Sequence, residues 1–213
     1  MAETNLCDDE PLVRIEDLTP YVAVRVDMVP SEVIGHALRL SAIEFASRTK
    51  AVKRTMFLDL QECVQHYALA HTDCYSIMAI ESVCMGATPL RATSVECCMG
   101  GGCWYAYERP ASLYIGLSPG CDQPRALEIR AVVIPGQDSC FLDEWVYQQH
   151  AEAIASGAVY RLLAMQDEEW FNPAMASLAA REFNAGVRRA ITLDRSHNST
   201  APQVARMPRG FFV

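Results

Sequence analysis

The chain has 213 residues, of which 51% are hydrophobic. This length and composition fit one domain, or a single hydrophobic core with an inserted segment. Its 18 basic and 26 acidic residues give a formal charge of −8, which argues against a general nucleic-acid-binding protein, since such proteins displace phosphate counterions with Lys and Arg. The acidic balance remains compatible with a channel through which DNA slides without sticking, and equally with ordinary solubility.

The first twenty residues are acidic and contain no basic segment followed by an apolar one, so they predict no signal peptide. No apolar run reaches the roughly 18 residues that a transmembrane helix needs. We therefore expect a chain without a membrane partner that folds in a cytoplasm. Residues 1–20 are expected to form a loosely ordered lead.

The first structured elements are predicted between residues 21 and 50. Residues 21–26 (YVAVRV) alternate and are β-branched, which favours a short strand. Pro30 then opens a helix that runs to about Arg48, with a main apolar stripe of Ile34, Leu38, Ala42 and Phe45. Further apolar residues lie on the back of this helix, and because a helix with two apolar sides is usually buried on both, we expect them to contact another subunit: Val33, Leu40 and Ile43.

From Thr55 to Pro135 the hydrophobic period changes to two, the period of a strand. Turn dipeptides at Met85-Gly86 and Pro119-Gly120 separate the candidate segments. Strands are expected from residue 55 to 61 and near 64–70, 75–84, 103–108, 112–118 and 126–134. Several short strands between turns predict a small antiparallel sheet or sandwich.

A helix is predicted next, ending near Met165 at the acidic run 167–169. Its middle is made of small residues, and Gly157 inside it predicts that another backbone comes close. His150 near its start is interpreted as a surface or interface residue, and Trp145 as a residue of the core or of a subunit interface. The apolar stripe of this helix is Tyr147, Ala151, Ile154, Ala158, Leu162 and Met165.

A second helix follows, with Asn172 as its N-cap and Pro173 at its first position. The short connection predicts that the two helices are antiparallel neighbours, closed by Trp170 in the turn. Arg181, Arg188 and Arg189 are expected away from the apolar stripe of Met175, Ala179, Phe183, Val187, Ala190 and Ile191.

Nine cysteines are many for a chain that folds in a cytoplasm, where disulfides are rare. We interpret most of them as free thiols that behave as small hydrophobic residues. Their odd number leaves intermolecular disulfides as an alternative. They are Cys7, Cys63, Cys74, Cys84, Cys97, Cys98, Cys103, Cys121 and Cys140.

One cluster has residue types that bind metal: Cys63, His66, His71 and Cys74, spaced C-x2-H-x4-H-x2-C. Zinc takes four such ligands tetrahedrally. A strand over this segment would place His66 and His71 on opposite faces, so ordinary strand and turn residues are the favoured interpretation. The glycines at 100–102 precede a strand-like run and are interpreted as a loop tip. The sequence predicts no enzymatic activity and no cofactor.

The phrase AIASGAVYRLLAMQDEEWFNPAMASLAAREFNAGVRRA (153–190) resembles the C-terminal helical pair of head–tail adaptor proteins of tailed phages. VPSEVIGHALRLSAIEFASRT (29–49) is similar to the opening helix of that family, and the middle of the chain matches loosely. The resemblance implies a neck protein of the virion, assembled in the host cytoplasm into a dodecameric ring beneath the portal. It also implies binding to the portal and to the next neck or tail protein, with DNA passing through the ring.

The fold class predicted is α+β. A helical bundle of residues 21–50 and 141–193 would carry a β-rich insertion at 51–140 and an extended arm at 194–213. Alternative functions are a tail-completion or tube-terminating protein, and a metal-binding module or enzyme that uses the Cys63–Cys74 cluster. The resemblance implies that the end of the arm grips the portal through Arg206, Met207, Pro208, Arg209, Gly210, Phe211, Phe212 and Val213.

Overall fold

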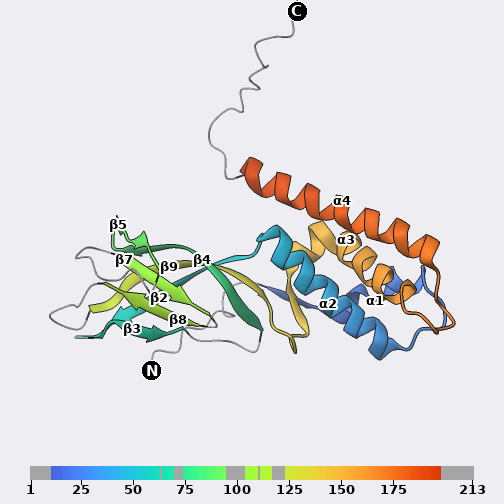
Figure 1. Cartoon of the computed structure of the whole chain (residues 1–213), viewed down its shortest axis with the longest axis horizontal. Coiled ribbons are helices and arrows are strands. Elements are labelled where there is room, and N and C mark those ends of the chain that lie inside the picture. Colours follow the sequence, from blue (N-terminus) through green and yellow to red (C-terminus); the bar gives the residue numbers. More distant parts are fainter. Residues whose placement is uncertain are drawn as a thin grey trace, which may run out of the picture.

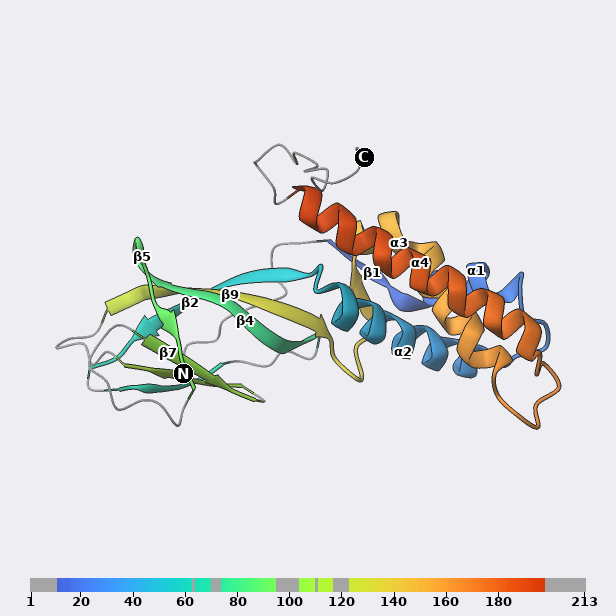
Figure 2. The same ribbon diagram turned by 45° about the horizontal axis from the view of Figure 1, so that its top comes forward.

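The computed structural model describes residues 11–62, 64–69, 74–94, 104–109, 111–116 and 123–197, and over these ranges the chain is an α+β protein. The predicted α+β class is confirmed. The helices gather at one end of an elongated molecule and most strands at the other (Figure 1). A view turned by 45° shows α2 and β9 meeting where the two parts join (Figure 2). Among the described residues, no helix combines the length and apolar composition that crossing a membrane requires.

The helical part is built from one short 3-10 helix and four α-helices of the described chain. Three of the α-helices are long, and the two C-terminal ones follow each other directly. In chain order the helices are η1 (Ile15–Leu18), α1 (Thr19–Ala23), α2 (Ser31–Thr49), α3 (Glu144–Leu163) and α4 (Pro173–His197).

Helix α2 begins after Pro30 and ends where Lys50 adopts a left-handed conformation with φ of 52°. The predicted inner stripe is confirmed, because its residues are at most 4% exposed. On the same side, the Ser41 hydroxyl donates a 2.6 Å hydrogen bond to the backbone carbonyl of Ile154. This stripe therefore packs against α3.

The connection between α3 and α4 forms as the sequence predicts. The Asn172 side chain accepts a 3.1 Å hydrogen bond from the backbone N–H of Met175, which is the N-cap bond expected for Asn172. Trp170 in the turn is half-buried and packs against the core. The α4 stripe is also largely as predicted, except that Met175 is 43% exposed and Ala176 is buried in its place.

The strands form two four-stranded sheets, ordered β2-β9-β4-β5 and β3-β8-β7-β6, and a separate β1-β10 pair. All neighbours are antiparallel except β6 and β7. Each of the six predicted strands has a counterpart, in β2, β3, β4, β7, β8 and β9. The bounds are β1 (Leu12–Arg14), β2 (Lys53–Leu60), β3 (His66–Ala68), β4 (Tyr75–Met85), β5 (Thr88–Pro89), β6 (Arg91–Ala92), β7 (Trp104–Glu108), β8 (Ser112–Ile115), β9 (Gln123–Pro135) and β10 (Phe141–Asp143).

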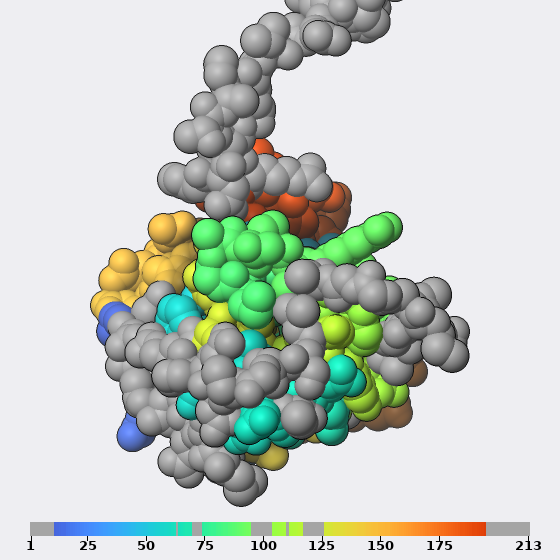
Figure 3. Space-filling view, turned by 90° about the vertical axis from the view of Figure 1, so that its left-hand side faces the viewer, coloured from blue at the N-terminus to red at the C-terminus, as the bar shows by residue number. Residues whose placement is uncertain are grey.

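Alternation along the strands decides which side chains enter the core of the strand part. Met56, Leu58 and Leu60 of β2 are buried, whereas Phe57 between them is 40% exposed. The Tyr107 hydroxyl donates a 3.2 Å hydrogen bond to the Ile77 carbonyl and so ties one sheet to the other. Viewed from the strand end, segments from β2 to β9 cover this face, with α4 behind them in red (Figure 3).

The strand predicted over residues 21–26 is wrong. Residues 19–23 form α1, and the backbone N–H of Val26 donates to the carbonyl of Val22. Leu18, Val22 and Val26 are buried and four residues apart, which is helical spacing, while Val24 is 82% exposed. Residues 11–20, expected to be loosely ordered, form β1 and η1 and start α1, because β1 pairs with β10. Residues 1–10 lie outside the described residues.

Helix α4 continues through His197, so the extended arm does not begin at residue 194 as expected. An ion pair of 3.6 Å between Asp194 and Lys53 fixes this part of α4 against the start of β2. The remainder of the predicted arm, residues 198–213, lies outside the described residues.

Candidate functional site

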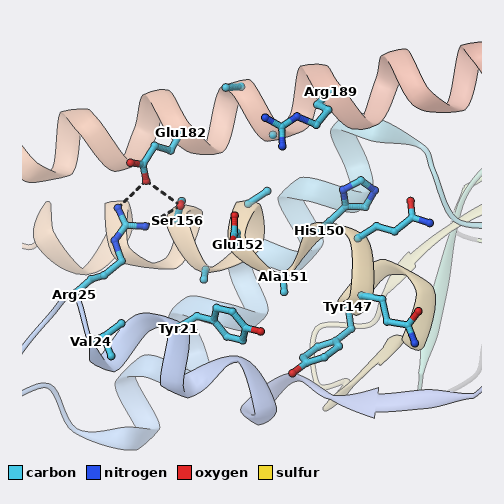
Figure 4. A pocket seen from close by; sticks show the side chains of 16 residues that line it. Tyr21, Val24, Arg25, Tyr147, His150, Ala151, Glu152, Ser156, Glu182 and Arg189 are labelled. Carbon is cyan, nitrogen blue, oxygen red and sulfur yellow. Dashed lines mark hydrogen bonds and ion pairs between the residues drawn. The ribbon is translucent and has the colours of Figure 1, made fainter.

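A groove of about 670 Å³ lies on the helical part, between α1, α3 and α4. Figure 4 shows α4 along one rim, α1 along the other and α3 between them. Tyr21, Val24 and Arg25 line it from α1 and the turn that follows, and Glu182 and Arg189 line it from α4. Residues of α3 between 147 and 156, without Ile154, form its floor.

Three side chains close one end of the groove. The Arg25 guanidinium donates a 2.7 Å hydrogen bond to a Glu182 carboxylate oxygen and a 2.9 Å bond to the Ser156 hydroxyl. The Ser156 hydroxyl donates in turn to the same Glu182 oxygen over 3.1 Å. The network ties the turn after α1 to α3 and α4, and it engages the Ser156 hydroxyl and the Glu182 carboxylate in contacts between elements. We therefore interpret the network as structural.

Small residues of the groove floor lie where α3 and α4 approach each other closely. A Cβ atom added to Gly186 of α4 would lie 2.4 Å from the Cβ of Ala153 on α3. Ala151 and Ala155 continue the floor and are 8% and 2% exposed. The groove floor thus lies close to the α3 backbone, and the polar side chains Gln148, Gln149 and Glu152 line it beside the alanines.

Two charged side chains stand in the groove without an ion pair. Glu152 on α3 and Arg189 on α4 are exposed, and no ion pair joins either of them to another part of the chain that the structure describes. Glu152 projects from the middle of the floor, and Arg189 lies near His150 (Figure 4). The groove therefore holds one charge of each sign that has no ion pair within the described residues.

His150 is buried at 6% exposure, so its interpretation as a surface residue is wrong. Its ring lies 5.0 Å from the Phe45 ring and 6.2 Å, edge-on, from the Trp145 ring. Burial lowers the pKa of His150 below its usual value, and the nearby Arg189 charge lowers it further. The imidazole is accordingly a neutral packing element between α2 and α3.

The predicted subunit-interface residues lie on two elements. On α2, Leu40 is 42% exposed while Val33 and Ile43 are half-buried, so the chain itself covers these residues only in part. Trp145 on α3 is half-buried and packs against the core beside His150. Contact with another subunit stays a prediction for all four.

The remaining predicted site residues are only partly described. The residues expected to grip the portal, 206–213, lie outside the described residues. Of the Cys/His cluster, Cys63 and His71 also lie outside them, whereas His66 stacks on Tyr114 at 4.7 Å. Within the described ranges no three His, Cys, Asp or Glu side chains are grouped so that they could hold a metal ion. Cys84 is half-buried and Cys140 is exposed, and both are free thiols.

Sequence reasoning missed the groove and its charged residues. Arg25 fell inside a predicted strand, Ser156 was placed on the polar side of its helix, and Glu182 was not singled out. Arg39 on α2 was also missed, although its position between Val33 and Ile43 could have suggested it. It is half-buried, and its Nε atom is buried without a hydrogen-bond partner among the described residues.

Comparison with known proteins gives no family: no protein-family model matches the chain, and no curated protein matches it significantly.

Proposed function

We propose that this chain is a structural head–tail adaptor of a tailed phage, present in the virion neck as a ring beneath the portal. The ring would continue the DNA channel without binding DNA specifically, and would dock the next neck or tail protein. Its partners would be the portal, other copies of the chain and that downstream protein. A dodecamer is the number that the resemblance to phage adaptors implies.

The observation that supports this proposal most is the second apolar side of α2. The inner side of α2 is buried within the chain, yet Leu40 on its back is 42% exposed, and Val33 and Ile43 are only half-buried. A helix that is apolar on two sides needs two partners. In a ring each subunit uses one surface toward one neighbour and a different surface toward the other, which supplies the second partner.

The division of the molecule is also suited to this role. In the proposal the helical part forms the body of the ring, and the strands between α2 and α3 form an insertion that projects from the body. Beyond α4, the arm would reach the portal, with Phe211 and Phe212 as apolar anchors and Arg206 and Arg209 as cations.

The experiment that tests the proposal is quantitative mass spectrometry of purified particles of the source phage, scoring copies of this chain against copies of the portal. A ratio near one-to-one is expected for a neck ring that matches the portal. Absence of the chain from the particles would overturn the proposal.

The role of the arm is tested separately by deleting residues 207–213 and measuring binding of the chain to purified portal. Loss of portal binding, with self-association unchanged, is the expected result. If the truncated chain binds the portal as well as the full chain does, the arm is not the portal anchor, and a position further down the tail becomes the better assignment.

A further inference from the structure

The groove and helix α2 lie on opposite sides of α3. The Ile154 carbonyl faces α2, because it accepts the hydrogen bond from Ser41. Glu152 lies two positions earlier, about 200° around the helix, and it lines the groove. Figure 4, which looks into the groove, accordingly shows α2 passing behind α3.

The outer ridge of α2, defined here as Arg39, Leu40 and Ile43, is made of exposed and half-buried residues, with Leu40 on its flank. Ser41 marks the side of α2 that contacts α3. Arg39 and Ile43 each lie two positions from Ser41, so they project from roughly the opposite side of the helix. The helical part therefore has a ridge on one side and a groove on the other.

Ridge and groove are complementary in their apolar surface. Ala151 and Ala155 keep the groove floor shallow, and beside them Gly186 packs against Ala153 of α3. Its rim carries Tyr21, which is 41% exposed, and Val24, which is 82% exposed. Leu40 of the ridge is also an exposed apolar side chain, and contact with Tyr21 and Val24 would remove it from water.

Ridge and groove are also complementary in charge. Arg39 is half-buried, and no ion pair or hydrogen bond satisfies its guanidinium within the described part of the chain. Partly burying a cation without a partner is unfavourable. Glu152 in the groove floor has no ion-pair partner in that part either, whereas the neighbouring Arg25 and Glu182 neutralise each other.

From these observations we propose that the outer ridge of α2 in one copy seats in the α1–α3–α4 groove of the next copy, where Arg39 pairs with Glu152. The inference rests on the proposed ring and names its subunit contact. Because ridge and groove are on opposite sides, the same contact repeats in one direction and closes a ring when the rotation fits.

A charge-swap experiment on the full chain tests this contact. The self-association constant is measured by sedimentation velocity for the wild type, for Arg39→Glu, for Glu152→Arg and for the double variant. Each single reversal places like charges against each other and is expected to weaken association roughly tenfold or more. The double variant restores opposite charges and is expected to recover to within about threefold of the wild type.

Matched controls make the same charge changes outside both surfaces, at Arg188→Glu on α4 and Glu169→Arg in the α3–α4 turn. Both positions are exposed and neither lines the groove. The controls are expected to associate as the wild type does. Circular dichroism and thermal melting of every variant separate lost association from lost folding.

A cross-link gives an independent measurement. A benzophenone amino acid at position 40 is expected, after irradiation, to join two chains, with the attachment mapped by mass spectrometry to residues of the groove. The inference is overturned if the cross-link maps elsewhere, if the double variant stays as weak as the single ones, or if the wild-type chain neither associates nor cross-links at any concentration.

These outcomes are distinct from those for the proposed function. If the chain is present with the portal in particles but the charge reversals do not change its self-association, it is an adaptor that uses another contact. If the charge reversals change self-association as expected but the chain is missing from particles, it has the proposed contact without the proposed role.

Discussion

His150 is a histidine that the fold places in an apolar interface rather than in a catalytic site. Phe45 of α2 and Trp145 of α3 pack around its ring, and the Arg189 cation of α4 lies nearby. Both burial and Arg189 disfavour the imidazolium ion, so the pKa of His150 falls below its usual value of about 6.5.

The free energy of unfolding should consequently depend on the protonation of His150. Because its pKa is lower in the folded chain, the unfolded chain binds more protons as the pH falls below about 6.5. Below about pH 6.5 this lowers the free energy of unfolding by at most about 1.4 kcal/mol per pH unit, the limit for one proton. Above about pH 6.5, His150 makes no such contribution. We expect His150→Gln to reduce this loss, measured by urea denaturation at a series of pH values.

The control for this prediction is His66→Gln, which replaces an exposed histidine at the strand end of the molecule. The comparison uses the difference in slope between variant and wild type, since carboxylates also titrate in the acid range. An identical pH dependence for His150→Gln and the wild type would contradict a lowered pKa of His150 in the folded chain.

At the scale of elements, the packing of α3 between α2 and α4 depends on Gly157. A Cβ atom added there would lie 2.2 Å from the Ser41 hydroxyl oxygen and 2.7 Å from the Phe183 ring. The sequence predicts that another backbone comes close to Gly157, whereas its nearest neighbours are side chains of α2 and α4. The glycine lets three helices pack tightly at one point.

Two glycine-to-alanine substitutions should therefore have opposite effects on stability. Gly157→Ala forces a steric clash in the core, and we expect it to lower the free energy of unfolding by about 1–3 kcal/mol. Gly35→Ala on α2 meets no atom within 4 Å, so the higher helix propensity of alanine should raise that free energy by up to about 1 kcal/mol. Thermal and urea denaturation of both variants measure the difference, and a stabilised Gly157→Ala variant would rule out the tight packing.

At the scale of the whole molecule, a buried ion pair joins the strand part to the helical part. Arg54 of β2 pairs with Asp143, the residue that precedes α3, and their side chains are 12% and 1% exposed. The guanidinium also lies 5.4 Å from the centre of the Tyr75 ring. Burial, and then the Asp143 charge, raise the pKa of Tyr75 far above its usual value, so the phenol stays protonated.

Removing one partner of this pair should destabilise the whole chain. Asp143→Ala leaves the Arg54 cation buried without its partner, and we expect a loss of about 3–5 kcal/mol in the free energy of unfolding. The adjacent Lys53 pairs with Glu81 and Asp194 at partly exposed positions, so Lys53→Ala should lose about 1 kcal/mol or less. Denaturation followed by tryptophan fluorescence compares the two variants. Equal losses of stability would contradict the structural role of the buried Arg54–Asp143 pair.

The sequence by itself determined the local elements of this protein. Hydrophobic periods of 3.6 and 2 marked α2, α3, α4 and six strands, and the Asn172 cap followed from its side chain and the proline after it. Such patterns depend on neighbours a few residues away, so they are visible in the chain alone. The alternation of residues 21–26 predicted a strand, but Val22 and Val26 also fit the spacing of a helix. Burial in the folded chain decided between strand and helix.

Tertiary structure decided the candidate site. Arg25, Ser156 and Glu182 come from three segments up to 157 residues apart, and the groove exists only because α1 and α4 pack on either side of α3. The sequence does not predict either that Arg39 and Glu152 have no ion pair among the described residues. Whether a charged side chain has a partner depends on contacts between distant segments, which no local pattern encodes.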